Sequence, residues 1–424
     1  MSINQFLPNG ASYEKRTERT KKNSVRYDGN KFERIDSADQ MSRTVRLLHE
    51  GKLSTVGSSK PGSGEELIKQ AAEMVQYGSP HDVEFVGKTD IAPMNLVDET
   101  TLSSKQMIDK IGAFVEDLRS FDSRLVVSAG LDATFVDVAL ETSHDFNHSY
   151  RKSLWSCGAS IELMQGEDLL AIYKSAMSIR PDFDLAELKE QLARKLEYSK
   201  NVVSIDAGAY PVIFSPAEVG NVLNPIVASL SGQAVYRKIS PWSDKLGQTL
   251  LDERVTLLDN GAEDGAWPSK PFDLEGTPTR RNVLVQNGTL GELITNRKVA
   301  AQLGRESSGN ASPYGASPNY LQLAAGSKSF DDLVKSIDKG VLIDGTMGAW
   351  SGNPYSGIVS GTISMGLKIE NGKIVGRIKD CMFTVNTFEH LRKHLIDCSA
   401  ERDQLRYGGL FPHMLLNEVV ISTK

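Results

Sequence analysis

Apolar runs separated by tight-turn residues dominate the C-terminal half of the chain. Two Asn-Gly pairs, Asn287-Gly288 and Asn371-Gly372, are each flanked by short runs rich in apolar residues. Asn-Gly accepts the positive φ angles of a type I′ turn, so the flanking runs are expected to pair as antiparallel strands. The runs are 283–286 with 290–294, and 366–369 with 374–378. Together they predict a curved antiparallel sheet or part of a barrel.

The N-terminal half mixes strand-like alternation with helical periodicity. Alternating runs around Asp28-Gly29-Asn30 and around Glu50-Gly51-Lys52 predict two further hairpins. The highly charged segment 12–23 is interpreted as a solvated edge strand or arm, and nucleic-acid contact is the alternative. A capping box of Ser63 and Glu66 followed by apolar residues at helical spacing predicts a helix that ends at Gly78. Apolar spacing also predicts helices over 103–121 and 185–198, and strands are predicted over 124–128, 134–141 and 159–164.

A long predicted helix ends near residue 199 and a new apolar strand begins near 211, which marks a domain boundary. Only three helices are predicted beyond it, at 216–231, 330–339 and 387–397, and residues 307–319 are expected to form a loop. The predicted fold class is therefore α+β. Residues 1–200 form an N-terminal domain of layered strands and helices, and residues 201–424 form a sheet-rich, part-barrel-like C-terminal domain.

The composition narrows the function classes. A chain of 424 residues exceeds the size of roughly 250–300 residues at which single cores stop growing, which favours two domains. A net charge of −6 argues against a protein that grips nucleic-acid phosphates. The three cysteines are not in Cys-x-x-Cys pairs, residues 1–23 lack an apolar secretion signal, and no run is long enough to span a membrane. We expect a soluble, cytoplasmic protein that binds neither nucleic acid nor membrane.

Two histidine pairs are candidate metal ligands. His390 and His394 stand four residues apart on a predicted helix, with Glu389 beside them, and such spacing puts both rings on one helix face. The apolar stripe of this helix is formed by other residues, so a solvated face is the competing interpretation. His144 and His148 lie in a polar turn between strands, where histidines usually face water.

The charged residues Asp273, Glu275, Arg280 and Arg281 cluster at a strand entry. They are candidates for substrate or partner contact, and an ion-paired loop that stabilises the sheet is the structural alternative. The sequence contains no nucleophile-elbow, phosphate-loop or dinucleotide motif, so nucleophilic hydrolases and nucleotide-dependent enzymes are not supported.

Several segments carry a resemblance to a known family. They are Asp273-x-Glu275-Gly276-x-Pro278-Thr279, Thr295-Asn296-Arg297, Asp338-x-Gly340 and Ile369-Glu370-Asn371-Gly372. On these residues the chain resembles the TldD/PmbA family, the so-called modulators of DNA gyrase, with weaker similarity from about residue 29 to the C-terminus.

The resemblance locates a missing motif. In the TldD branch, a strand leads into a helix that carries His-Glu-x-x-x-His, in which the histidines hold zinc, the glutamate is the general base and a later cysteine completes the site. Aligned with that pattern, this chain has Pro216, Ala217 and Asn221, and no histidine between 148 and 390. The neighbourhood of Tyr407 that should hold the cysteine contains none.

The chain is more similar to the PmbA/TldE branch, which lacks the zinc motif. That resemblance implies a non-catalytic subunit that pairs as a heterodimer with a TldD-like zinc metallopeptidase in the proteolysis or maturation of peptides. No cofactor is then expected in this chain, and zinc is expected in the partner subunit. Self-association as a homodimer, a metallopeptidase rebuilt at His390 and His394, and a regulatory or binding protein without a peptidase partner are the alternatives.

Overall fold

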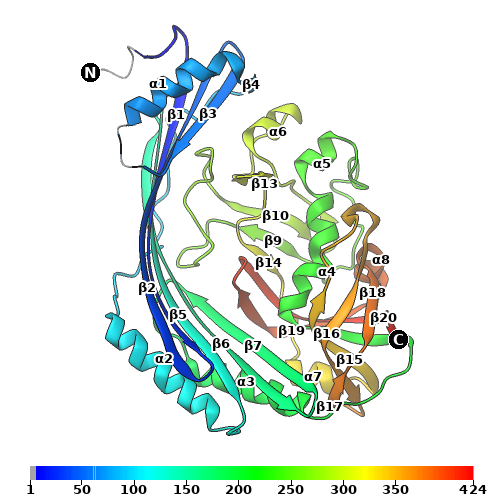
Figure 1. Ribbon diagram of the computed structural model, residues 1–424. Coiled ribbons are helices and arrows are strands. Elements are labelled where there is room, and N and C mark those ends of the chain that lie inside the picture. The colour runs from blue at the N-terminus through cyan, green and yellow to red at the C-terminus, as the bar shows by residue number, and fades with distance from the viewer. Residues whose placement is uncertain (1–5, 61, 63, 424) are drawn as a thin grey trace.

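The computed structural model describes residues 6–60, 62 and 64–423. The N-terminal half forms a long curved sheet of seven strands in the order β4-β3-β2-β1-β5-β6-β7, whose concave side faces the C-terminal half (Figure 1). The strands are β1 (Ser12–Asp28), β2 (Lys31–His49), β3 (Lys52–Ser58), β4 (Ser79–Pro80), β5 (Val126–Thr142), β6 (Asn147–Gln165) and β7 (Asp168–Ser178).

Helices cover one face of this sheet. Helices α2 (Ser104–Arg119) and α3 (Leu185–Ser199) bury a stripe of apolar residues against the sheet, while α1 (Gly64–Met74) packs on β2 and β3 and continues into the short η2 (Val75–Tyr77). The predicted helix start near residue 103 is confirmed, and Ser103 and Gln106 form a reciprocal capping box there that was not predicted. The capping box predicted at Ser63 and Glu66 includes Ser63, which lies outside the described residues.

Segment 12–23 is not an edge strand or arm, because it is part of β1, which pairs with β2 on one side and β5 on the other. Its charges are accommodated within the sheet by ion pairs, such as Lys15 Nζ with Glu141 Oε1 at 3.0 Å. The separate strands predicted at 124–128 and 134–141 are one continuous strand, β5. When one face of a long strand is polar, its apolar residues do not form a run over the whole strand, so the sequence pattern underestimates its length.

The second sheet has eleven strands, and five of them close into a barrel. Strand β8 pairs in parallel with β15 and antiparallel with β20, which completes the ring β8-β15-β16-β18-β20. The strands are β8 (Gly208–Phe214), β9 (Leu257–Asn260), β10 (Arg281–Gln286), β11 (Thr289–Leu290), β14 (Leu321–Leu323), β15 (Lys339–Met347), β16 (Ile358–Glu370), β17 (Lys373–Ile378), β18 (Cys381–Asn386), β19 (Leu395–Leu405) and β20 (Gly409–Thr423). A separate small hairpin joins β12 (Ala311–Ser312) to β13 (Gly315–Ala316).

Both predicted Asn-Gly hairpins are confirmed. Asn287 and Gly288 have φ of 47° and 74° between β10 and β11, and Asn371 and Gly372 have φ of 50° and 71° between β16 and β17. The α+β class and the part-barrel are therefore both observed.

Helix α4 (Pro216–Ser229) lies against the barrel strands (Figure 1). Its residues Val219, Val222 and Ile226 share one buried core with Phe214 and Phe383. Helix α7 (Phe330–Lys335) covers part of the outer face, over Ile213 and Leu415 among others. Within the described residues, no helix is both long and apolar enough to cross a membrane.

The predicted helices of the C-terminal half are partly wrong. The helix at 387–397 ends early, because α8 covers only Thr387–Lys393 and Leu395 already starts β19. The short helices α5 (Gly232–Tyr236), α6 (Arg297–Gln302) and η3 (Pro354–Ser356) were not predicted. Helices of one or two turns have no full apolar period, so their existence depends on caps and on tertiary contacts.

Ion pairs join the two halves at their interface. Lys174 of β7 pairs with Asp403 of β19 at 3.0 Å, and Lys195 of α3 pairs with Asp344 of β15. His413 of β20 lies beside these charges with its ring stacked 4.3 Å from that of Phe330. Burial is the main cause that lowers the pKa of His413 to about 4.

The lowered pKa predicts acid sensitivity. Between pH 6.5 and pH 4 the unfolded chain binds a proton at residue 413 that the folded chain does not, so the free energy of unfolding falls as the pH falls. We expect His413→Gln to remove roughly 2 kcal/mol of this pH dependence, measured by urea unfolding at pH 7, 5.5 and 4.5. An unchanged acid dependence in the variant would contradict this assignment.

Candidate functional site

The N-terminus of α4 is the position at which the family resemblance places a metal site. The buried strand β8 ends at Phe214, and Ser215 adopts the extended conformation of a helix N-cap. Proline at the first helical position, Pro216, has the φ that a helix start requires and lacks an N–H that would be unpaired there. This local chemistry explains why α4 begins where it does.

The three positions of the missing motif provide no zinc-binding group. Pro216 is buried and Ala217 has only a methyl side chain. Asn221 donates its carboxamide N–H to Glu218 Oε2 at 2.9 Å. Carboxamides are weak zinc ligands beside imidazole, thiolate and carboxylate groups. The residues present therefore do not fit the metal of the TldD branch.

Glu218, one position beyond the expected glutamate, is held by the barrel. Its carboxylate accepts hydrogen bonds from the backbone N–H of Thr346 at 3.0 Å and from the Thr346 hydroxyl at 2.7 Å, in addition to the Asn221 bond. The side chain is only 7% exposed. These contacts tie α4 to β15 and leave little of the carboxylate for an external ligand.

Tyr407 lies on the same face of α4. Its hydroxyl donates to the carbonyl oxygen of Ala217 at 3.2 Å, and a Cβ on Gly220 would be 2.6 Å from that hydroxyl oxygen. Glycine at 220 therefore allows the ring to lie against the helix. The residue as a whole is 60% exposed, but its hydroxyl end lies against the helix. Desolvation there raises the pKa of Tyr407, and the carboxylate of Glu218 adds to the rise.

In the neighbourhood where the resemblance expects a cysteine, the structure thus places a tyrosine against the first turns of α4. Glu218, Thr346 and Tyr407 were not predicted as site residues. Thr346 and Tyr407 are 128 and 190 residues from their partners on α4, and no local pattern indicates such pairings.

A cavity of about 350 Å³ lies near the turn that carries Tyr407. It is formed mainly on β1, β5, β6 and β7, and Glu33 of β2 and Arg406 of the β19–β20 turn also line it. The lining includes Arg26, which donates to Asp132 at 2.7 Å, together with several serine and glycine residues. Its hydroxyl and charged groups can bind polar parts of a ligand, and its apolar surface can contact the rest.

The pair His390 and His394 is split by the end of α8. The ring centroids are 5.2 Å apart, but His394 is the C-cap residue and not part of the helix. His390 is 9% exposed, so the expectation that both rings lie off the buried face is wrong for this residue. Its two ring nitrogens lie 2.8 Å and 3.2 Å from the carbonyl oxygens of Asn386 and Glu418.

The other pair is also separated. His144 lies 3.3 Å from Glu84, and the Nε2 of His148 lies 2.8 Å from the carbonyl oxygen of Thr89. In the part of the chain that the structure describes, no group of three or more histidine, cysteine or acidic side chains is arranged to hold a metal ion.

The charged residues predicted to cluster at 273–281 have different structural roles. Asp273 is 1% exposed and accepts hydrogen bonds from the backbone N–H groups of Glu275, Thr277 and Ala311. The carboxylate of Glu275 accepts from the backbone N–H of Arg297 at 2.9 Å. Asp273 and Glu275 therefore stabilise turns.

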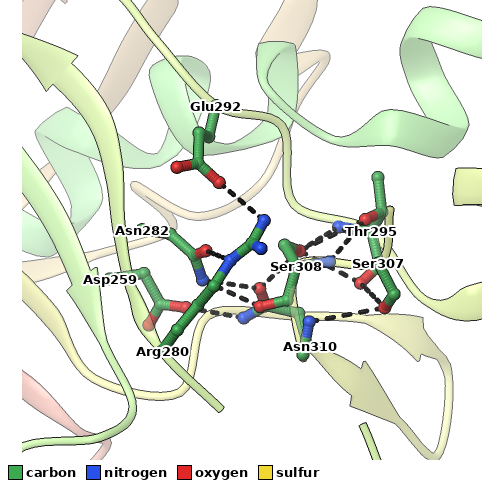
Figure 2. A network of polar contacts seen from close by, with 9 residues as sticks. Asp259, Arg280, Asn282, Glu292, Thr295, Ser307, Ser308 and Asn310 are labelled. Atoms are coloured by element: carbon green, nitrogen blue, oxygen red, sulfur yellow. Dashed lines mark hydrogen bonds and ion pairs between the residues drawn. The ribbon is translucent and has the colours of Figure 1, made fainter. Parts of the chain in front are cut away.

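The two arginines point to a different network. Arg280 pairs with Glu292 at 3.0 Å and donates to Asn282 (Figure 2). Arg281 is an exposed residue at the start of β10. Asn282 donates to the carbonyl oxygen of Ser308, and Asn310 donates to the buried carboxylate of Asp259 at 2.6 Å. Ser308 and Asn310 are buried, so part of the expected loop 307–319 is anchored in the domain core.

Three comparisons place the chain among known proteins. A family model described as PmbA/TldA metallopeptidase C-terminal domain matches residues 207–423. A metalloprotease of Methanothermobacter thermautotrophicus is 25% identical over 87% of this chain and 84% of its own length. The metalloprotease PmbA homolog of Haemophilus influenzae is 26% identical over 84% of this chain and 81% of its own length.

A solved structure has the same fold. TldE from Thermococcus kodakarensis superposes with a TM-score of 0.92 at 21% identity, covering 99% of this chain and 98% of that one. At this identity the similarity establishes the fold and not the activity.

Burial of Asp273 raises the pKa of its carboxyl to about 6. Between pH 4 and pH 6 the folded chain retains a proton that the unfolded chain releases, so this group contributes stability at low pH that is lost as the pH rises through 6. We expect wild type to lose roughly 3 kcal/mol of unfolding free energy relative to Asp273→Asn between pH 4 and pH 7.

The measurement is urea unfolding of both proteins across that range, with Asp331→Asn on the exposed start of α7 as the matched control. The pH dependence that Asp273 gives to the unfolding free energy is opposite in sign to that of His413. Each variant is therefore compared with wild type separately. A constant difference across the range would show that Asp273 is ionised throughout.

Proposed function

Because the chain belongs to the PmbA/TldD metallopeptidase family, we propose that it is a non-catalytic, TldE/PmbA-like subunit. It pairs with a TldD-like zinc metallopeptidase and takes part in the proteolysis or maturation of peptides. The partner supplies the zinc and the general base, and this chain supplies part of the surface that holds the peptide.

The observation that carries this proposal is the state of the α4 N-terminus. Proline, alanine and asparagine stand at the three motif positions, and Asn221 is engaged with Glu218. Tyr407 packs over the same helix face at Gly220. A hydrolytic zinc site needs several imidazole, thiolate or carboxylate ligands and an open position for water. These residues provide neither.

The retained fold supports a role in peptide binding. Strand pairing is a common way to hold an extended peptide, because main-chain hydrogen bonds work with any sequence. The cavity beside Arg406 offers hydroxyl and charged groups of the N-terminal sheet. A subunit of this kind extends the surface that a catalytic partner presents to its substrate.

A rebuilt metal site at His390 and His394 finds little support. Both ring nitrogens of His390 lie within hydrogen-bonding distance of backbone carbonyl oxygens, and a nitrogen that carries a proton for such a bond has no lone pair for a metal.

The test is reconstitution. The chain alone, a zinc-bearing TldD-type homologue alone, and their mixture are incubated with an unstructured peptide, and products are measured by mass spectrometry beside zinc content. We expect less than ~0.1 zinc per chain and no cleavage from this chain alone, since α4 lacks ligands. Cleavage should rise at least ~10-fold on mixing and disappear when a chelator removes zinc from the partner.

Two controls sharpen the result. Asn221→Ala leaves cleavage by the mixture unchanged, because Asn221 has no part in the chemistry. Replacing the motif glutamate of the partner with glutamine abolishes it. Stoichiometric zinc and cleavage by this chain alone, or inactivity of every such mixture, would refute the proposal.

A further inference from the structure

The cavity that Arg406 adjoins lies on the concave face of the N-terminal sheet (Figure 1). Successive residues of a strand point to opposite faces of its sheet. Core residues of β5 and β6, such as Leu131 and Ala159, pack with residues of α2 and α3 on one face. The alternate residues of the same strands therefore face the C-terminal half, and they form most of the cavity lining.

Small residues in register form the floor of this cavity. Gly130 of β5 lies opposite Gly158 of β6, and Gly158 lies opposite Ser175 of β7. In the neighbouring row, Ser128 lies opposite Ser160. Glycine within a strand often marks a place where a ligand or another chain segment approaches the sheet closely. The floor thus leaves room above three adjacent strands.

The two glycines also allow longer side chains to lie flat along the sheet. A Cβ on Gly130 would be 2.6 Å from Nη1 of Arg26, and a Cβ on Gly158 would be 2.9 Å from the hydroxyl oxygen of Tyr173. Arg26 extends from β1 over β5, and Tyr173 extends from β7 over β6. Asp132 accepts hydrogen bonds from Arg26 at 2.7 Å and 3.0 Å, so these two opposite charges compensate each other.

Uncommitted hydrogen-bond donors gather on the β7 side of the cavity. The hydroxyls of Ser160, Tyr173 and Ser175 form no hydrogen bond with another described residue. The same is true of the guanidinium of Arg406. Strand β19 lies beside β7, so the turn that follows β19 brings Arg406 to the cavity from this side. A guanidinium together with hydroxyls is a typical set of donors for a carboxylate.

Carboxylates lie on the opposite side, where β1 turns into β2. Asp28 and Glu33 line the cavity there, and both are exposed. Asp28 accepts a hydrogen bond from Ser128 at 2.6 Å, and Glu33 pairs with Arg34. A carboxylate has about four sites for hydrogen-bond donors, so both groups can also accept bonds from an ammonium group. The cavity therefore has charged groups of opposite sign on its two sides.

The spacing of the strands sets the length of a ligand that reaches both sides. Strands β1, β5, β6 and β7 are consecutive in the sheet, and neighbouring strands lie about 4.8 Å apart, so the outer two are about 14 Å apart. An extended peptide rises about 3.3 Å per residue, so four residues cover about 13 Å.

We propose that this cavity binds a short peptide of about four residues whose two ends are both free. The peptide carboxylate pairs with Arg406 and the hydroxyls of the β7 side, and the ammonium group pairs with Asp28 and Glu33. The serine and glycine floor contacts the peptide backbone and leaves room for different side chains. Peptides of this size are products of peptide cleavage. That link rests on the proposed function, whereas the binding is a property of this chain alone.

The test is isothermal titration of the full chain with tetraalanine, and with tetraalanine acetylated at its N-terminus or amidated at its C-terminus. We expect tetraalanine to bind about 10-fold more tightly than either blocked peptide, because each block removes one charge-assisted contact. Arg406→Gln should weaken the binding of tetraalanine about 10-fold and leave that of the amidated peptide unchanged.

Two further variants serve as controls. Arg402→Gln, at an exposed position of β19 away from the cavity, should bind all three peptides like wild type. Asp28→Asn should affect the other end of the ligand: it weakens the binding of tetraalanine about 5-fold and leaves that of the acetylated peptide unchanged. Folding of each variant is checked by circular dichroism, and Asp28→Asn replaces Arg406→Gln as the deciding variant if the latter does not fold.

Three results would overturn the proposal. They are no binding of tetraalanine at ~10 mM, equal binding of the blocked and unblocked peptides, and a folded deciding variant that binds tetraalanine like wild type. Each of them is obtained without a partner subunit and leaves cleavage by the mixture with a zinc-bearing homologue unaffected. Failure of this inference is therefore distinguishable from failure of the proposed function.

Discussion

The double pairing of β8 is the constraint on which the C-terminal half depends. Strand β8 pairs in parallel with β15 and antiparallel with β20, and these two pairings close the sheet. They also fix the place where the chain leaves β8. Helix α4 follows at once and lies against the barrel core. The same closure brings Thr346 of β15 to Glu218 of α4. Closure of the barrel therefore fixes both the position of α4 and the hydrogen bonds of Glu218.

The interface between the two halves follows from the same geometry. The barrel presents Asp344 and, through β19, Asp403 to lysines of the curved N-terminal sheet and its helix α3. The halves therefore meet through charged pairs beside an apolar cluster. Partly buried ion pairs contribute modest net stability, but they restrict which surfaces can dock, since an unpaired charge at such a place is costly. The concave face of the sheet is held opposite the barrel by these contacts.

Local signals in the sequence predicted local structure well. The Asn-Gly hairpins form because their turn chemistry is contained in two adjacent residues, and α2 forms where the apolar spacing of residues 103–121 predicts a helix. Strand lengths were underestimated where a face is polar, as in β2, whose residues 31–40 are all exposed. Barrel closure was only partly predictable, because the pairing of β8 with β15 joins residues more than a hundred positions apart. The side chains around α4 could not be found for the same reason: Glu218 and Tyr407 acquire their partners only in the folded chain.

The contact between Tyr407 and Gly220 also couples two distant parts of the chain. The tyrosine hydroxyl donates to the carbonyl oxygen of Ala217, and a Cβ at residue 220 would meet it at 2.6 Å. Any side chain at position 220 would therefore displace the ring or move the helix. The β19–β20 turn and α4 can thus change only together, because a larger residue at 220 requires a smaller one at 407.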